Sequence, residues 1–168
     1  TGPVGVSTNS QTNAVVGINP PHLAVSPLNH NFGSVTTGQT NTLNFSVSNS
    51  GDVTLTGTAT TVLPFGVSSN ATFSVGPGLT GTVSVSFMPT SAISSAADVV
   101  FNSNGGISTN TVTGTGLTPG SISVSPVAYA FGTLATGTLA QTVFTVSNSG
   151  GTPVTNGVAT VPSPFEIV

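Results

Sequence analysis

Apolar and polar side chains alternate along two segments of this chain. In residues 43–48 the odd positions are Leu, Phe and Val, and the even positions are Asn and Ser. Residues 83–88 place Val, Val and Phe at the odd positions, against Ser, Ser and Met. Because successive side chains of a strand point to opposite faces, this alternation predicts half-buried strands of an antiparallel sheet.

Further strands are predicted where β-branched and aromatic residues lie between turn signals. They cover residues 53–60, 71–75, 98–102 and 107–115, with another between His22 and His30. The turn signals are Asn-Ser-Gly-Asp at 49–52, Gly-Pro-Gly at 76–78 and Asn-Gly-Gly at 104–106. No segment has the sustained apolar period of about 3.6 residues that indicates a helix. Short strands between frequent turns predict an all-β sandwich.

The chain repeats itself with a nearly constant spacing. Phe-Ser-Val-Ser-Asn-Ser-Gly at 45–51 matches Phe-Thr-Val-Ser-Asn-Ser-Gly at 144–150, an offset of 99 positions. Phe32-Gly33 recurs as Phe131-Gly132 at the same offset, whereas Pro64-Phe65 recurs as Pro164-Phe165 at an offset of 100. One residue inserted at a turn explains the change, because loops tolerate insertions.

These repeats divide the chain into three predicted parts. Residues 18–116 form a complete repeat, residues 117–168 the N-terminal half of a second repeat, and residues 1–17 the final strand of a preceding repeat or an N-terminal extension. We expect the chain to be a window on a longer tandem array. A filament, in which neighbouring chains complete the partial units by strand addition, is a variant of this hypothesis.

Several motifs of the complete repeat resemble a known family. They lie at residues 25–27, 32–38, 45–51, 73–78, 83–89 and 112–116. Together they resemble the immunoglobulin-like repeat of abnormal-spindle/hydin (ASH) type, whose bacterial choice-of-anchor D relatives occur in tandem in secreted or surface-attached proteins. The resemblance implies a seven-stranded immunoglobulin-like sandwich that serves as a spacer or binding scaffold and has no catalytic motif.

Charge is nearly absent from the sequence. The 168 residues include no Lys or Arg and only three acids, while 36% are hydrophobic. Nucleic acid is excluded as a partner, because its phosphates are held mainly by Lys and Arg. No run approaches the roughly 18 apolar residues of a spanning helix, so we expect no membrane insertion. With little charge repulsion, the expected partners are copies or neighbouring repeats of the same protein.

Few side chains could support catalysis or metal binding: Asp52, Asp98, Glu166, His22, His30 and Tyr129. We interpret Asp52 as a turn residue that hydrogen-bonds its own backbone, and Asp98, which should open a strand, and Glu166 as solvated charges. Two histidines without cysteine or nearby acids do not supply the ligands of a zinc site. Nucleophile-elbow and phosphate-loop motifs are missing. The sequence predicts no enzyme, catalytic residue, metal or cofactor.

Residues without a matching partner in the other repeat are not required by the fold. His22 and His30 correspond to Ser121 and Tyr129, so we interpret both as surface residues, although either could ligate a haem supplied by another chain. Phe32 and Phe131, by contrast, recur in register and are predicted to be core residues.

Two short motifs fit the acceptor pattern for N-glycosylation. They are Asn44-Phe45-Ser46 and Asn70-Ala71-Thr72. Asn44 is expected to point away from the apolar face that carries Phe45, and Asn70 is expected in a loop. Both asparagines are therefore possible glycosylation sites.

Two functions fit this pattern. The first is a structural repeat of an extracellular or cell-surface assembly of bacterial type, such as a tandem array, sheath or filament. The alternative is an adhesin or recognition module that binds glycans or surface proteins through loops 62–70 or 91–97. Phe65 and Phe165 recur in register, as core residues should, and this favours the structural role.

Overall fold

The computed structural model describes residues 1–2 and 17–168. Within these residues there are eleven β-strands and no helix that could cross a membrane. The strand expected in residues 1–17 lies almost wholly outside the described part of the chain.

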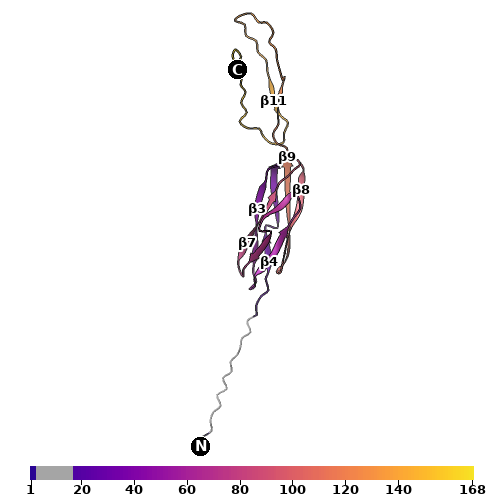
Figure 1. Ribbon diagram of the computed structural model, residues 1–168, viewed down its shortest axis with the longest axis vertical. Coiled ribbons are helices and arrows are strands. Elements are labelled where there is room, and N and C mark those ends of the chain that lie inside the picture. Colours follow the sequence, from indigo (N-terminus) through magenta and orange to yellow (C-terminus); the bar gives the residue numbers. More distant parts are fainter. Residues whose placement is uncertain (3–16) are drawn as a thin grey trace.

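Nine strands fill residues 23–117 and form a sandwich of two sheets (Figure 1). One sheet has the order β1-β3-β7-β5 and the other the order β2-β9-β8-β4-β6. The strands are β1 Leu23–Ser26, β2 Asn29–Thr36, β3 Asn41–Asn49, β4 Leu55–Thr60, β5 Phe65–Ser69, β6 Thr72–Val75, β7 Thr80–Phe87, β8 Ser94–Ser103 and β9 Gly106–Leu117.

The two alternating segments of the sequence lie side by side in one sheet. Strands β3 and β7 pair antiparallel, with Phe45 opposite Val83 and Leu43 opposite Val85. Phe45 and Val83 are completely buried. The all-β, immunoglobulin-like sandwich predicted from this alternation is confirmed.

Strand β2 is a strand that the alternation does not reveal. Its buried residues, Phe32 and Val35, are three positions apart because Gly33 adopts a positive φ of 72° and the pairing with β9 shifts register there. Such a bulge interrupts the period of two on which the prediction rests. Strand β5 was also missed, and β8 begins at Ser94 instead of residue 98. The sandwich therefore has nine strands where the family resemblance implied seven.

The first two strands belong to different sheets although only two residues separate them. Strand β1 pairs antiparallel with β3, whereas β2 pairs with β9, and this second pair is parallel. The crossing at Pro27 and Leu28 is held by Asn110, whose Nδ2 donates to the Pro27 carbonyl at 2.7 Å, and by the Thr111 N–H, which donates to the Leu28 carbonyl at 3.0 Å. Because β2 continues in the direction of β1 after the crossing, it runs alongside β9 in the same direction.

Phenylalanine rings from both sheets meet in the core. Phe32 of β2 lies 5.8 Å from Phe65 of β5 and 5.9 Å from Phe87 of β7, measured between ring centroids. Phe65 and Phe87 stack at 4.8 Å. Farther along, Phe45 lies 5.6 Å from Phe101 of β8. The rings thus join the two sheets, and all six phenylalanines of the sandwich are buried.

Asn49, at the end of β3, is one of two buried polar residues in the described part of the chain. Its Oδ1 accepts from the backbone N–H groups of His22 at 3.1 Å and Gly51 at 3.0 Å. Its Nδ2 donates to the carbonyls of Val53 at 2.8 Å and Val75 at 3.2 Å. One side chain therefore satisfies backbone groups around the 49–52 turn and at the end of β6.

The chain continues beyond the end of the sandwich at which β9 stops (Figure 1). There, β10 (Ile122–Ser125) pairs antiparallel with β11 (Thr145–Asn148). The rest of residues 118–168 is extended and forms no further strand.

We predict that Asn49→Ala lowers the free energy of unfolding of the sandwich by about 2–4 kcal/mol, since it leaves buried backbone groups without partners. Asn148, the repeat equivalent of Asn49, is exposed, so Asn148→Ala is the matched control and should cost under about 1 kcal/mol. Urea unfolding followed by circular dichroism measures both values. Equal losses for the two variants would contradict this interpretation.

Candidate assembly surface

The second repeat reproduces the strand pairing of the first. Ile122 lies opposite Asn148 in the pair β10–β11, as Leu23 lies opposite Asn49 in the pair β1–β3. Each residue of the second pair lies 99 positions after its counterpart. The same sequence motif therefore forms the same two-stranded unit in both repeats.

The turn that follows is also the same. Asn148 Oδ1 accepts from the N–H groups of Ser121 at 2.9 Å and Gly150 at 3.0 Å, and its Nδ2 donates to the Thr152 carbonyl at 2.9 Å. These are the counterparts of the bonds that Asn49 makes within its own turn. The turn is thus formed without a covering sheet.

Aromatic contacts of the second repeat match those of the first as well. Phe131 and Phe165 stack with centroids 5.9 Å apart, close to the 5.8 Å between Phe32 and Phe65. The Tyr129 ring meets the edge of Phe131 at 5.0 Å, the same separation as between His30 and Phe32. The two repeats therefore place equivalent rings in equivalent pairs.

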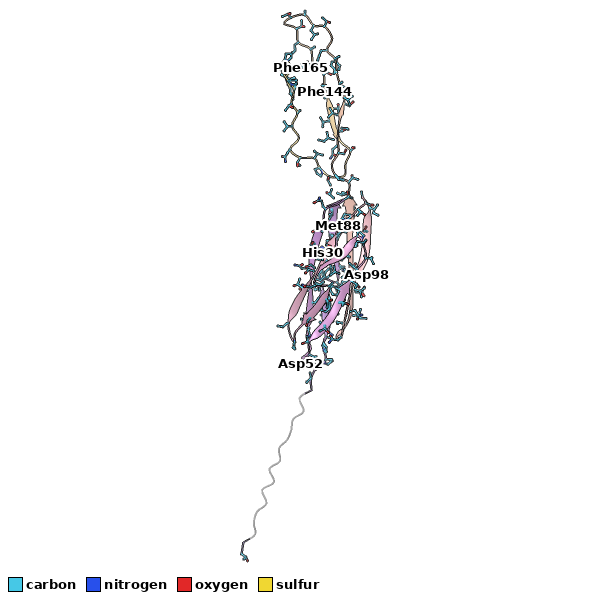
Figure 2. All side chains as sticks on the ribbon, viewed as in Figure 1. His30, Asp52, Met88, Asp98, Phe144 and Phe165 are labelled. Atoms are coloured by element: carbon cyan, nitrogen blue, oxygen red, sulfur yellow. The ribbon has the colours of Figure 1, made fainter. Side chains whose placement is uncertain are left out.

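The repeats differ in burial. Phe45 and Val47 are 0% exposed, whereas their counterparts Phe144 and Val146 are 46% and 63% exposed. Phe165 is 54% exposed, although Phe65 is buried. Figure 2 shows Phe144 and Phe165 in the part of the chain beyond the sandwich. We call the surface formed by Phe131, Phe144, Val146 and Phe165 the open face.

The prediction that Phe131 and Phe165 are core residues is therefore wrong for the described structure. Phe131 is half-buried, and Phe165 is exposed. The physical reason is that the second repeat has strands equivalent to β1 and β3 but none equivalent to β7, β8 or β9 within the described residues. The side chains have the apolar character of a core without the opposite sheet.

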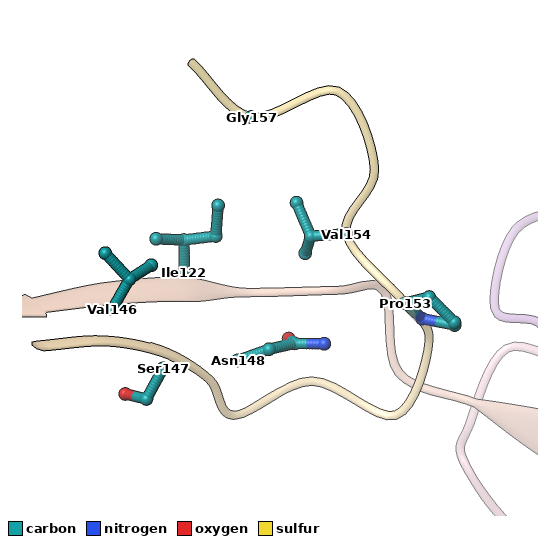
Figure 3. Close-up of a pocket in the computed structure, with 7 residues that line it drawn as sticks. All are labelled: Ile122, Val146, Ser147, Asn148, Pro153, Val154 and Gly157. Atoms are coloured by element: carbon teal, nitrogen blue, oxygen red, sulfur yellow. The ribbon is translucent and has the colours of Figure 1, made fainter. Parts of the chain in front are cut away.

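A hollow of about 520 Å³ lies against the β10–β11 pair (Figure 3). Ile122, Val146 and Val154 project into it on the same side of the ribbon. Its other lining residues are Ser147, Asn148, Pro153 and Gly157. In the first sandwich the end of β6 lies beside the equivalent asparagine, since Asn49 also donates to the carbonyls of Val75 and Gly76.

The titratable residues of the described chain do not converge on a site. Figure 2 shows Asp52 at the end where the chain enters the sandwich, and His30 and Asp98 farther along it. No group of three His, Cys, Asp or Glu side chains that could hold a metal ion occurs among the described residues. His22 is exposed, with Nδ1 3.1 Å from the Ser50 hydroxyl, and His30 is half-buried.

Asp52 has a different role from the one predicted. Its carboxylate does not bind its own turn but accepts from the backbone N–H and from Nδ2 of Asn19, both at 2.9 Å. The turn N–H of Gly51 is already bonded to Asn49 Oδ1, so the carboxylate faces the segment that leads into β1. Asp52 therefore attaches this segment to the turn.

Asp98 and Glu166 are both exposed, as expected for solvated charges. Asp98 lies within β8 and does not open a strand, because β8 begins four residues earlier, at Ser94. Its Oδ1 accepts from the Thr111 hydroxyl at 3.1 Å on the neighbouring strand.

The two possible glycosylation sites lie on the surface. Asn44 is exposed on β3, away from Phe45, and its Oδ1 accepts from the Ser84 hydroxyl at 2.7 Å. Asn70 is exposed between β5 and β6 with φ of 56°, and its Nδ2 donates to the Thr82 carbonyl at 2.8 Å. That either residue carries a glycan stays a prediction.

The predicted recognition loops are shorter than expected. Residues 65–69 form β5 and residues 94–97 belong to β8, which leaves loops at 61–64 and 88–93. Leu63 is exposed in the first of these loops, whereas Phe65 is buried. Neither loop therefore presents an aromatic ring for stacking on a sugar.

Sequence reasoning missed two features of this region: the hydrogen bonds of the repeated asparagine and the open face. The signal for the first was the Asn within Val-Ser-Asn-Ser-Gly, which recurs in both repeats. The signal for the second was that residues 80–117 have no counterpart in the sequence after Val168.

Residues 21–116 match the family model described as HYDIN/CFA65/VesB-like, Ig-like domain. Comparison with curated protein sequences gives no match. A crystal structure of a protein of unknown function from Porphyromonas gingivalis W83 is similar, with a TM-score of 0.51 and 19% identity over 61% of this chain and 50% of that one. The ASH/PapD-like domain 7 of human CEP192 is similar with a TM-score of 0.51 and 12% identity, over 69% of this chain and 99% of that domain. These likenesses show the fold, and this chain spans half of the Porphyromonas protein.

We predict that Phe144→Ser lowers the fluorescence of a dye that binds exposed apolar surface by roughly twofold, because it removes a ring from the open face. Val143→Ser is the matched control. Val143 is 79% exposed but corresponds to Asn44, which points away from the core in the first repeat. Dye titration of both variants measures the effect, and an equal decrease for the two would show that the dye does not distinguish this face.

Proposed function

The chain belongs to the HYDIN/CFA65/VesB-like Ig-like domain family, and from that premise we propose that it is a non-catalytic structural repeat of an extracellular or cell-surface assembly. In this proposal successive repeats form a tandem array, and the partners of each repeat are its neighbours. The described sandwich is an immunoglobulin-like structural module.

The observation that carries the proposal is the junction between the two repeats. Only residues 118–121 separate β9 from β10. The Gly151 N–H lies 2.7 Å from the Thr118 hydroxyl oxygen and 3.2 Å from its carbonyl oxygen, so the linker is attached to the turn of the second repeat. A linker that is short and hydrogen-bonded suits an extended array better than a pair of independently moving domains.

The segment that leads into the first repeat has the same arrangement. The Asp52 N–H donates to the Asn19 carbonyl at 3.1 Å, and Asn19 and Asp52 are the counterparts of Thr118 and Gly151. The connection therefore recurs at the start of each repeat, although the side chains differ. This recurrence supports a unit that is built to be joined end to end.

The outer surface of the sandwich supports close packing in an assembly. On the outer face of the β3–β7 pair, Ser46 lies opposite Thr82 and Ser48 opposite Thr80. Hydroxyl groups form hydrogen bonds with neighbours but carry no charge, so copies of this surface do not repel each other. An extracellular location is consistent with this composition.

The separation of the described titratable side chains supports the absence of catalysis. General acid–base or metal-assisted chemistry needs several such groups at one place. Asp98 is bonded to Thr111 on the surface, and Asp52 is bonded to the linker residue Asn19. Each therefore has a structural partner, and neither lies beside a second acid in these bonds.

We predict that the polypeptide isolated from its natural source has an intact mass well above 16.4 kDa, because an array contains further repeats. We also predict that antibodies raised against residues 23–117 label intact cells. A mass near 16.4 kDa with labelling of intact cells would support the filament variant instead. Labelling only after permeabilisation would contradict the proposed extracellular role.

A further inference from the structure

We propose that the open face is an acceptor for strands of its own repeat type, and that a β7-like strand docks beside β11 with its phenylalanine between Phe131 and Phe165. This inference rests on the proposed structural role, and it specifies the partner chemistry of the second repeat. The occupant is an uncharged set of strands with the pattern of β6–β9. It is identified by the filled version of the same surface within this chain.

The aromatic part of the acceptor is already assembled. In the first sandwich Phe87 completes a group of three rings, 4.8 Å from Phe65 and 5.9 Å from Phe32. The equivalents of these two rings, Phe165 and Phe131, lie 5.9 Å apart in the second repeat. The open face thus holds two rings of the group and lacks the third.

The strand edge beside this pair is available as well. Strand β3 pairs with β1 on one edge and with β7 on the other. Strand β11 pairs with β10, the counterpart of β1, and its other edge has no partner among the described residues. An incoming strand can therefore form an antiparallel ladder there, in the register that places Val83 opposite Phe45.

A polar contact adds selectivity for backbone. Asn49 Nδ2 donates to three carbonyls, two of which belong to Val75 and Gly76 after β6. Asn148 Nδ2 donates to the Thr152 carbonyl, and no equivalent of the other two acceptors occurs in the described structure. The end of a β6-like strand would supply them above the hollow in Figure 3.

The pattern of β7 states what the acceptor requires. Its inward positions are Gly81, Val83, Val85 and Phe87, and the last three are completely buried. Gly81 lies opposite Val47 where the side chain of Val75 approaches, at 3.0 Å from the position that a Cβ atom would occupy. A fitting strand therefore has a small residue first, then two aliphatic residues and an aromatic ring at alternate positions.

The test is to append a copy of residues 69–117 after Val168, because Val168 corresponds to Ser68 at the offset of 100. Tyr129 is the only tyrosine, the chain has no tryptophan, and the appended copy adds neither. Tyrosine fluorescence therefore reports on the second repeat alone. We expect a cooperative thermal transition of this fluorescence in the extended chain and a gradual change in the original chain.

Two variants of the appended copy make the test specific. Phe87→Ser in the copy should abolish the cooperative transition or lower its midpoint by about 10 °C or more. Thr82→Ala in the copy, at an exposed position of β7, should leave it nearly unchanged. A gradual change in the extended chain, a cooperative transition in the original chain, or equal behaviour of the two variants would overturn the inference. None of these results bears on the intact mass or the cell labelling, so the proposed function is tested separately.

Discussion

Phe32, Phe65 and Phe87 meet between two sheets that are otherwise connected only by turns and crossings. The chain has no Lys, Arg or Cys, so neither a salt bridge to Lys or Arg nor a disulfide can add to its stability. Burial of a large apolar side chain contributes about 1.5–3 kcal/mol. The sandwich consequently depends on each sheet covering the rings of the other, and the second repeat shows what remains when one sheet is missing.

What remains is the local structure. Asn148 still bonds to Ser121, Gly150 and Thr152, because these groups belong to one strand pair and its turn. Phe131 and Phe165 still stack, but the face that they form is exposed. Turn hydrogen bonds and aromatic contacts thus define an incomplete unit whose shape specifies the strands that complete it. This hierarchy connects the fold to a structural role, since a repeat attached through its linker residue Thr118 continues the array with a partner surface already formed.

Much of the fold followed from simple periodicity. Strands β3 and β7 were predicted because 43–48 and 83–88 alternate, and the ASH-type resemblance of the motifs is confirmed by the family that matches residues 21–116. The bulge at Gly33 hid β2, and the sheet crossing at Pro27 depends on tertiary contacts with Asn110 that no local pattern contains. The role of the repeated asparagine was missed for the same reason, because its partners are identified only by the folded turn and β6. Asp52 was placed correctly in a turn but given the wrong partner, since its acceptor groups bind a residue 33 positions away.

Hydrogen exchange of the backbone amides in the two copies of the Phe-x-Val-Ser-Asn motif tests this account most directly. The copies at 45–49 and 144–148 have nearly the same sequence, so their intrinsic exchange rates are similar. If burial under the opposite sheet is what stabilises the motif, the amides of Phe45 to Asn49 exchange at least roughly a hundredfold more slowly than those of Phe144 to Asn148, as expected for a core strand compared with an uncovered one. Equal protection of the two copies would contradict the account, because it would mean that the strand pair is stable without the apolar layer.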